Sequence, residues 1–166
     1  MYPIIKAQHK PILVLAWGNM SRGDDALGPM CLAGLQALLA PHQLQQVDFL
    51  DDYQLQVDYA PDLLWRRVVL FIDASLTAAA PFEAYALQPQ RDTSYSSHAV
   101  SAPSLLQVFE DVYDQSAPAA TMLAIRGESF ELGDPLSVAA QTHLQAAQDW
   151  ALTWVAQQCA QELSDA

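Results

Sequence analysis

The sequence predicts an α/β sandwich, in which a largely parallel sheet of five strands is covered by helices on both faces. Two observations lead to this fold class. Short, almost wholly apolar runs alternate along the chain with longer segments whose apolar residues recur at helical spacing. The chain also has 166 residues, of which 52% are hydrophobic, which is enough to bury a sizeable core. We therefore expect a single domain over residues 1–166.

Five segments have the composition of strands. Residues 11–17 (PILVLAW) and 68–74 (VVLFIDA) are apolar at nearly every position, which is typical of parallel strands with both faces covered. Residues 119–127 are expected to form another buried strand, and residues 45–51 a weaker one. Residues 82–88 alternate apolar and polar side chains, which indicates a strand with one solvated face.

Helical periodicity fills the gaps between these strands. Residues 26–40 repeat their apolar side chains at helical spacing, and Pro29 falls in the first turn, where its missing N–H costs little. Three further helices are predicted, namely residues 57–67, interrupted or started at Pro61, residues 104–113, opened by Pro103 and Ser104, and residues 136–163. The polar, serine-rich residues 91–103 are expected to form a loop.

Composition excludes several classes of partner. The formal net charge of −12 argues against binding to nucleic acid or to an anionic membrane, and it favours cations or a basic segment of a partner. Cys31 and Cys159 follow no paired spacing, so we expect two core residues rather than a zinc knuckle or a disulfide framework. Neither a signal peptide nor an apolar run of about 20 residues is found, so we expect a cytoplasmic protein.

The segment after the first strand, AWGNMSRGDDALGP (16–29), has the glycine spacing of a phosphate-binding loop but the opposite charge. Where that motif requires Lys and Ser or Thr, this chain has Asp24 and Asp25. A bound phosphate would face both carboxylates, so we reject the phosphate-loop interpretation. Ser21 and Asp24 have the spacing of a capping box, which explains one acid as a helix cap. The pair together predicts a turn that faces a cation.

Polar side chains follow other strands at the same predicted edge of the sheet. Asp73 is the sole charge after five apolar residues, and His98 lies in the serine-rich loop after the fourth strand. An acid of the glycine turn, Asp73 and His98 would form a site of two oxygen ligands and one nitrogen, suited to a divalent ion such as nickel, zinc, cobalt or manganese. Simpler explanations are that Asp73 bonds a loop backbone and that His98 is an exposed histidine. Asp51 and Asp52 are weaker candidates.

These residues resemble a known family, the maturation proteases of nickel–iron hydrogenases. The family's hallmark is a strand followed by Gly-Asn, four residues, an acidic pair and a nearby glycine, and ILVLAWGNMSRGDDALGP (12–29) matches it. VVLFIDAS (68–75) resembles the family's strand that ends in Asp, and His98 lies where the family has its histidine before a helix. GESFELGDPLSVAAQ (127–141) is similar to the glycine-bearing segment that precedes the family's C-terminal helix. The four blocks occur in the family's order along nearly the whole chain.

The resemblance implies a fold and an activity. The fold is a three-layer α/β/α sandwich around a twisted sheet. The activity is that of an endopeptidase, which removes a short C-terminal extension from the hydrogenase large-subunit precursor once nickel has been inserted. The family's metal-contacting residues are the second acid of the pair, the Asp at the strand end and the histidine. They correspond here to Asp25, Asp73 and His98, which we expect to be the catalytic and metal-binding residues, with Asp24 as a structural cap.

The loop after the second strand departs from the family. Many members have a D-G-G-T-like turn there, whereas this chain has DDYQLQVD (51–58). The resemblance therefore does not define how this loop contacts the substrate. The QLQ within it is similar to proteases that serve NAD-linked or bidirectional hydrogenases.

Three functions compete for the same three residues. In the first, nickel carried by the precursor's cysteines is bound by Asp25, Asp73 and His98, and it polarises the scissile carbonyl or an attacking water. The site of the free enzyme is then empty or filled by another divalent cation. In the second, the chain is a non-catalytic nickel-checkpoint chaperone that binds the loaded precursor without cutting it. In the third, it is a metal-dependent hydrolase of small amides.

Overall fold

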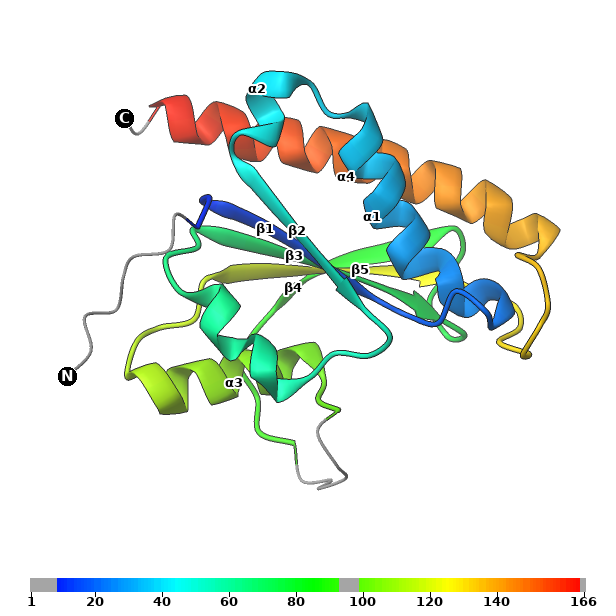
Figure 1. Cartoon of the computed structure of the whole chain (residues 1–166), viewed down its shortest axis with the longest axis horizontal. Coiled ribbons are helices and arrows are strands. Elements are labelled where there is room, and N and C mark those ends of the chain that lie inside the picture. Colours follow the sequence, from blue (N-terminus) through cyan, green and yellow to red (C-terminus); the bar gives the residue numbers. More distant parts are fainter. Residues whose placement is uncertain (1–8, 93–98, 165–166) are drawn as a thin grey trace.

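Five strands form one twisted sheet through the middle of the molecule (Figure 1). The structure is a computed structural model that describes residues 9–92 and 99–164. The strand order is β2-β1-β3-β5-β4, and the strands that run parallel are β1 (Ile12–Trp17), β2 (Val47–Asp52), β3 (Val68–Ser75) and β5 (Ala119–Arg126). β4 (Phe82–Leu87) pairs with β5 in the antiparallel direction.

Helices cover both faces of the sheet, which confirms the predicted fold class. α1 (Leu27–Leu38) and α4 (Val138–Ser164) lie on one face, and α3 (Ala102–Tyr113) lies on the other face with the 3-10 helix η2 (Val57–Leu63) (Figure 1). Two single-turn elements complete the order, namely the 3-10 helix η1 (Gly23–Ala26) before α1 and α2 (Pro41–Leu44) after it.

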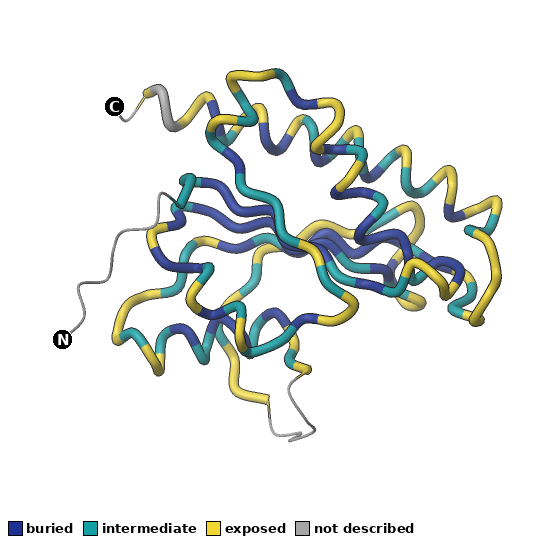
Figure 2. Tube along the Cα trace, viewed as in Figure 1, coloured by how far each residue is buried: buried dark blue, intermediate teal, exposed yellow. Residues whose placement is uncertain are grey.

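Alternation along the strands explains why their sequences are apolar throughout. On β1, Ile12 and Val14 face the α1 and α4 side, whereas Leu13 and Leu15 face the α3 side. All four side chains are buried, because each face of the sheet has its own layer of helices. Figure 2 shows this burial as a dark core along the central strands. Cys31 and Cys159 are both buried in the core under α1 and α4, as expected.

Three element boundaries differ from the sequence-based expectations. β3 does not end at Asp73, because Ala74 and Ser75 continue the parallel ladder with β5. α3 is not opened by Pro103 and Ser104 as caps. Its cap is Ser101, whose side-chain oxygen accepts a hydrogen bond from the Ser104 N–H at 3.3 Å. The expected helix over 57–67 is the shorter η2, with Pro61 inside it.

The edge strand β4 also differs from expectation. Alternation predicted one solvated face, but residues 83–86 are all exposed, so both faces of its middle are open to solvent. β4 lies at the edge of the sheet, next to β5 alone. None of the helices in residues 9–92 and 99–164 has the length and hydropathy to cross a membrane.

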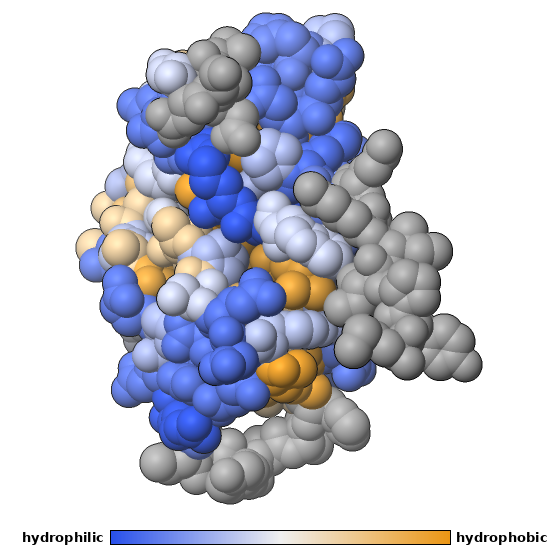
Figure 3. Space-filling view, turned by 90° about the vertical axis from the view of Figure 1, so that its left-hand side faces the viewer, coloured by the Kyte–Doolittle hydropathy of each residue, from blue (hydrophilic) through white to orange (hydrophobic). Residues whose placement is uncertain are grey.

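The edge where the parallel strands begin is held by ion pairs. Asp48 accepts a hydrogen bond from the buried Arg66 guanidinium and lies 3.8 Å from the Lys10 Nζ. Burial by itself would raise the pKa of Asp48, but the hydrogen bonds from Arg66 and Lys10 and their charges lower it. Figure 3 shows this side of the molecule, where the described surface is mostly hydrophilic. The opposite edge carries the predicted site.

Candidate active site

Two glycines place the turn after β1 directly on the ends of the strands. Gly18 has φ 148°, and a Cβ there would lie 2.0 Å from the carbonyl oxygen of Asp25. A Cβ at Gly28 would lie 2.5 Å from the Trp17 carbonyl oxygen and 2.9 Å from that of Ile72. The start of α1 therefore packs on the backbone of β1 and β3. Gly18, the first glycine of the spacing that resembles a phosphate loop, allows this close approach together with Gly28.

This packing brings Asp25 and Asp73 together at the carboxyl edge of the sheet. The Asp25 Oδ2 accepts a hydrogen bond from the Asn19 N–H at 3.0 Å, and the Asp73 Oδ1 accepts one from the Ala74 N–H at 2.8 Å. Burial and the nearby negative charge of Asp25 raise the pKa of Asp73 to about 7, although hydrogen bonds from the Ala74 N–H and the Trp17 side chain favour its charged form. The charge of Asp25, in η1 after the first strand, thus acts on the carboxyl of Asp73 in β3.

A pair of carboxylates in this setting fits a divalent cation. The Asp73 carboxyl is half-buried near a second negative charge, so a cation between the two would offset both effects. Carboxylate oxygens are suitable ligands for borderline divalent ions when a nitrogen ligand completes the set. Within residues 9–92 and 99–164, no three His, Cys, Asp or Glu side chains converge on one point, so the pair needs a further ligand.

The predicted third ligand, His98, lies outside the described residues. The described chain resumes at Ala99, which pairs with Gln56, and the Val100 N–H donates a hydrogen bond to the Leu55 carbonyl at 3.1 Å. Leu55 and Gln56 follow β2, at the same edge of the sheet as the two acids. The role of His98 as the third ligand therefore stays a prediction.

Asp24 has a different environment from its neighbour Asp25. Its side chain is 1% exposed, and its carboxylate accepts four hydrogen bonds from Glu128, Ser129 and Ser137. Burial would raise the pKa of Asp24, but these hydrogen bonds lower it below the usual value. The two acids therefore differ in their contacts, since Asp24 bonds residues 128–137 whereas Asp25 bonds Asn19 and acts on Asp73.

The capping-box interpretation of Ser21 and Asp24 is wrong in its detail. No side chain caps η1, and the Asp24 N–H donates to the Ser129 carbonyl at 2.9 Å. The Asp24 carboxylate binds the N-terminus of α4 instead, through the backbone N–H and the hydroxyl of Ser137. Asp24 makes structural contacts, as expected, but its partner is Ser137, the residue that caps α4 and lies 113 residues away.

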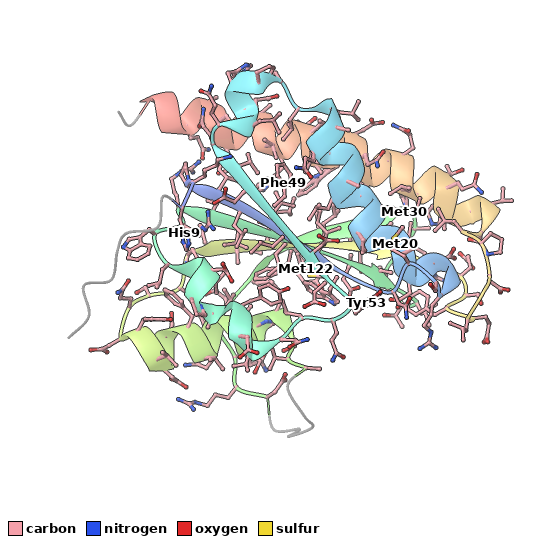
Figure 4. All side chains as sticks on the ribbon, in the orientation of Figure 1. His9, Met20, Met30, Phe49, Tyr53 and Met122 are labelled. Atoms are coloured by element: carbon pink, nitrogen blue, oxygen red, sulfur yellow. The ribbon has the colours of Figure 1, made fainter. Side chains whose placement is uncertain are left out.

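A groove of about 270 Å³ opens beside the turn. It is lined by Gly18, Met20, Pro29, Asp51, Asp52 and Tyr53. Met20 and Tyr53 are 59% and 72% exposed, and both are labelled in Figure 4, at the side where β2 ends. Asp52 accepts hydrogen bonds from the Tyr59 hydroxyl and the Tyr53 N–H, whereas Asp51 is exposed.

Sequence reasoning placed the two acids of DDYQLQVD at this edge but missed the groove. The available signal was the pair of large apolar side chains, Met20 and Tyr53, in polar loops after two neighbouring strands. Two other histidines have structural partners, since His9 and His143 bond the carbonyl oxygens of Leu64 and Arg126 at 2.9 and 2.7 Å.

Several solved structures with a similar fold are hydrogenase maturation proteases. The chain is similar to the hydrogenase maturating endopeptidase HybD from E. coli, with a TM-score of 0.68 and 19% identity over 89% of this chain and 93% of that one. The chain has the fold of the hydrogenase maturation proteases.

Two further structures agree with this result. The nickel–iron hydrogenase maturation protease HycI from Thermococcus kodakarensis gives a TM-score of 0.66 at 18% identity, over 90% of this chain and 94% of that one. The hydrogenase 2 maturation peptidase from a Thaumarchaeota archaeon gives 0.62 at 21% identity, over 88% and 98%. No family model and no curated protein sequence matches the chain. The likeness confirms the fold that the sequence resemblance implied.

Proposed function

We propose that this chain is a cytoplasmic endopeptidase that removes the C-terminal extension from the nickel-loaded large-subunit precursor of a nickel–iron hydrogenase. The observation that carries the proposal is the meeting of Asp25 and Asp73 at the carboxyl edge of a fold shared with maturation proteases. The match of the glycine turn to the family's sequence pattern supports the same activity.

Nickel would arrive with the substrate, held by cysteines of the precursor. Asp25 and Asp73 would approach it with carboxylate oxygens, and His98 would supply a nitrogen ligand. Bound there, nickel would fix the extension against the site and polarise the scissile carbonyl or a water. The partly buried carboxylate pair suits this role because, among the described residues, no basic side chain contributes to the pKa of Asp73.

Hydrolysis would then need a proton acceptor and no protein nucleophile. A water oxygen attacks the scissile carbonyl carbon, a carboxylate of the site takes the water's proton, and the proton passes to the leaving amine as the C–N bond breaks. The acceptor would be a carboxylate that is not fully engaged with nickel. Neither cysteine is placed to act as a nucleophile, since Cys31 and Cys159 are buried and burial raises the pKa of the Cys31 thiol to about 12.

The groove beside the turn would receive part of the extension. Its walls include the exposed Met20 and Tyr53, which offer apolar contact, and its lining also includes the exposed Asp51. The QLQ in the loop after β2 favours a large subunit of the NAD-linked or bidirectional class as the substrate.

The test is to incubate the purified precursor, with and without nickel, with the protein and to record the intact mass of the precursor. We expect a shortened C-terminus only for the nickel-loaded form. An intact precursor in a stable complex would indicate the checkpoint chaperone instead. Turnover of short peptides without the precursor would indicate a hydrolase of small amides. Efficient cutting of the nickel-free precursor would overturn the proposed role of nickel.

A further inference from the structure

The buried carboxylate of Asp24 joins the turn that carries Asp25 to a segment far away in the sequence. Its Oδ2 accepts hydrogen bonds from the Glu128 N–H at 2.7 Å and the Ser129 N–H at 3.4 Å. Ser137, 113 residues from Asp24, donates its N–H to Oδ1 at 2.7 Å and its hydroxyl to Oδ2 at 2.8 Å. Oδ2 thus accepts three hydrogen bonds and Oδ1 accepts one, so both oxygens have donors.

Ser137 connects this carboxylate to α4. Its hydroxyl oxygen also accepts a hydrogen bond from the Ala140 N–H at 3.1 Å, so Ser137 caps the helix while it binds Asp24. α4 has 27 residues, and a carboxylate beside its N-terminus is favoured by the unpaired N–H groups there. The turn is therefore fastened to a long, well-packed element.

Backbone hydrogen bonds join the same two segments. The Gly23 N–H donates to the Asp134 carbonyl at 3.2 Å, and the Gly133 N–H donates to the Ser21 carbonyl at 2.7 Å. A Cβ at Gly127 would lie 3.0 Å from the Asp24 Cβ, so the segments also pack closely. The strand ends hold the turn from one side, through Gly18 and Gly28. Residues 127–137 hold it from the other.

We infer that Asp24 and Ser137 are positioning residues, which together hold the turn so that the Asp25 carboxylate stays beside Asp73. Neither side chain needs to touch the substrate for this role. The effect on cleavage rests on the proposed function. The effect on the position of Asp25 does not rest on the proposed function. The Asn19 N–H donates a hydrogen bond to the Asp25 carboxylate at 3.0 Å, so exchange of this amide follows the position of Asp25 without any substrate.

Ser137→Ala is the informative variant. It removes one donor to Asp24 and the cap of α4, and it leaves the Asp24 carboxylate in place. Ser137→Thr keeps the hydroxyl and serves as the conservative rescue. Asp24→Asn is less suitable, because its amide N–H₂ would face a ring of donors. Val155→Ala is the control for stability, since Val155 is buried in the same helix and makes none of the hydrogen bonds to Asp24. If Ser137→Ala does not fold, Ser137→Cys takes its place.

Two measurements on the full chain decide the matter. The first is the hydrogen-exchange protection of the Asn19 amide by NMR, and the second is the kcat and KM for the nickel-loaded precursor. In Ser137→Ala we expect Asn19 protection and kcat to fall about tenfold each, with KM within about twofold. Ser137→Thr should restore both values, and Val155→Ala should lower Tm while leaving kcat unchanged.

Each result has one meaning. Unchanged Asn19 protection in Ser137→Ala would overturn the inference, whether or not kcat falls. Loss of kcat in Val155→Ala equal to that in Ser137→Ala would also overturn it, because stability alone would then explain the effect. If the wild-type protein does not cut the precursor but Asn19 responds as expected, the positioning role holds and the proposed function fails.

Discussion

Asp73 differs from an ordinary surface aspartate in what surrounds it. It lies inside β3, two residues before the strand ends, and the negative charge of Asp25 faces it. Burial and this like charge raise the pKa of its carboxyl to about 7. These surroundings disfavour the charged form of the Asp73 carboxyl at neutral pH, which lowers the free energy of unfolding. A cation bound beside the carboxyl would offset this loss.

Asp73→Asn should make the free protein more stable at pH 8 while removing its activity. The folded protein favours protonated Asp73, because its pKa of about 7 lies above the value of about 3.9 in an unfolded chain. The carboxyl therefore destabilises the fold increasingly as the pH rises from about 4 to 7, and fully above 7. We expect the Tm of the variant to exceed that of the wild type at pH 8, by about 2–4 °C for each kcal/mol recovered, and to match it near pH 4.

Thermal unfolding of the two proteins at both pH values checks this prediction. Asp149→Asn, at an exposed position of α4, is the matched control and should leave Tm unchanged at either pH. A lower Tm for Asp73→Asn at pH 8 would show that Asp73 stabilises the fold, which contradicts its place in a site.

At the scale of elements, the approach of α1 to the strand ends builds the site. Gly28 lies in the first turn of α1, over the backbone of β1 and β3. Gly34 lies in the same helix, but a Cβ there would meet only the side-chain amide of Gln148, at 2.0 Å from its Nε2. A flexible amide can move aside, whereas a strand backbone cannot.

Gly28→Ala should therefore disturb the fold and the site, and Gly34→Ala should not. Forcing a methyl group against the carbonyl oxygens of Trp17 and Ile72 should lower the free energy of unfolding by about 1–3 kcal/mol and reduce precursor cleavage. Gly34→Ala should stay within about 1 kcal/mol of the wild type, since alanine favours the helix and Gln148 can shift. Urea unfolding and the cleavage assay measure both effects. Equal losses in the two variants would refute the argument from Gly28.

Local patterns predicted most elements and the meeting of the two acids. Apolar runs found the five strands, and the rule that parallel strands share a carboxyl edge brought Asp25 and Asp73 together. The cap of α3 was missed because Pro103 and Ser104 resemble a helix start, while Ser101 makes the contact. The partner of Asp24 could not be predicted, because Ser137 is 113 residues away and only the folded chain brings it close. His98 stays a prediction.

At the scale of the whole molecule, the two ends of the parallel strands carry different groups. Ion pairs such as Asp48 with Arg66 close the edge where the parallel strands begin. The other edge gathers the paired carboxylates, the groove and the loops that follow the strands. With a net charge of −12, the chain as a whole attracts a cationic centre or a basic segment rather than another anion. A precursor that carries nickel next to its C-terminal extension fits this field.

The most direct test compares cleavage of the nickel-loaded precursor by the wild type and by Asp25→Asn, Asp73→Asn and His98→Ala, followed as the intact mass of the precursor over time. Asp149→Asn is the control and should cut at the wild-type rate. Since loss of even an outer partner of a metal ligand costs about 10–100-fold, we expect each of the three variants to be slower by at least about 100-fold. Cleavage at the wild-type rate by all three variants would contradict the account.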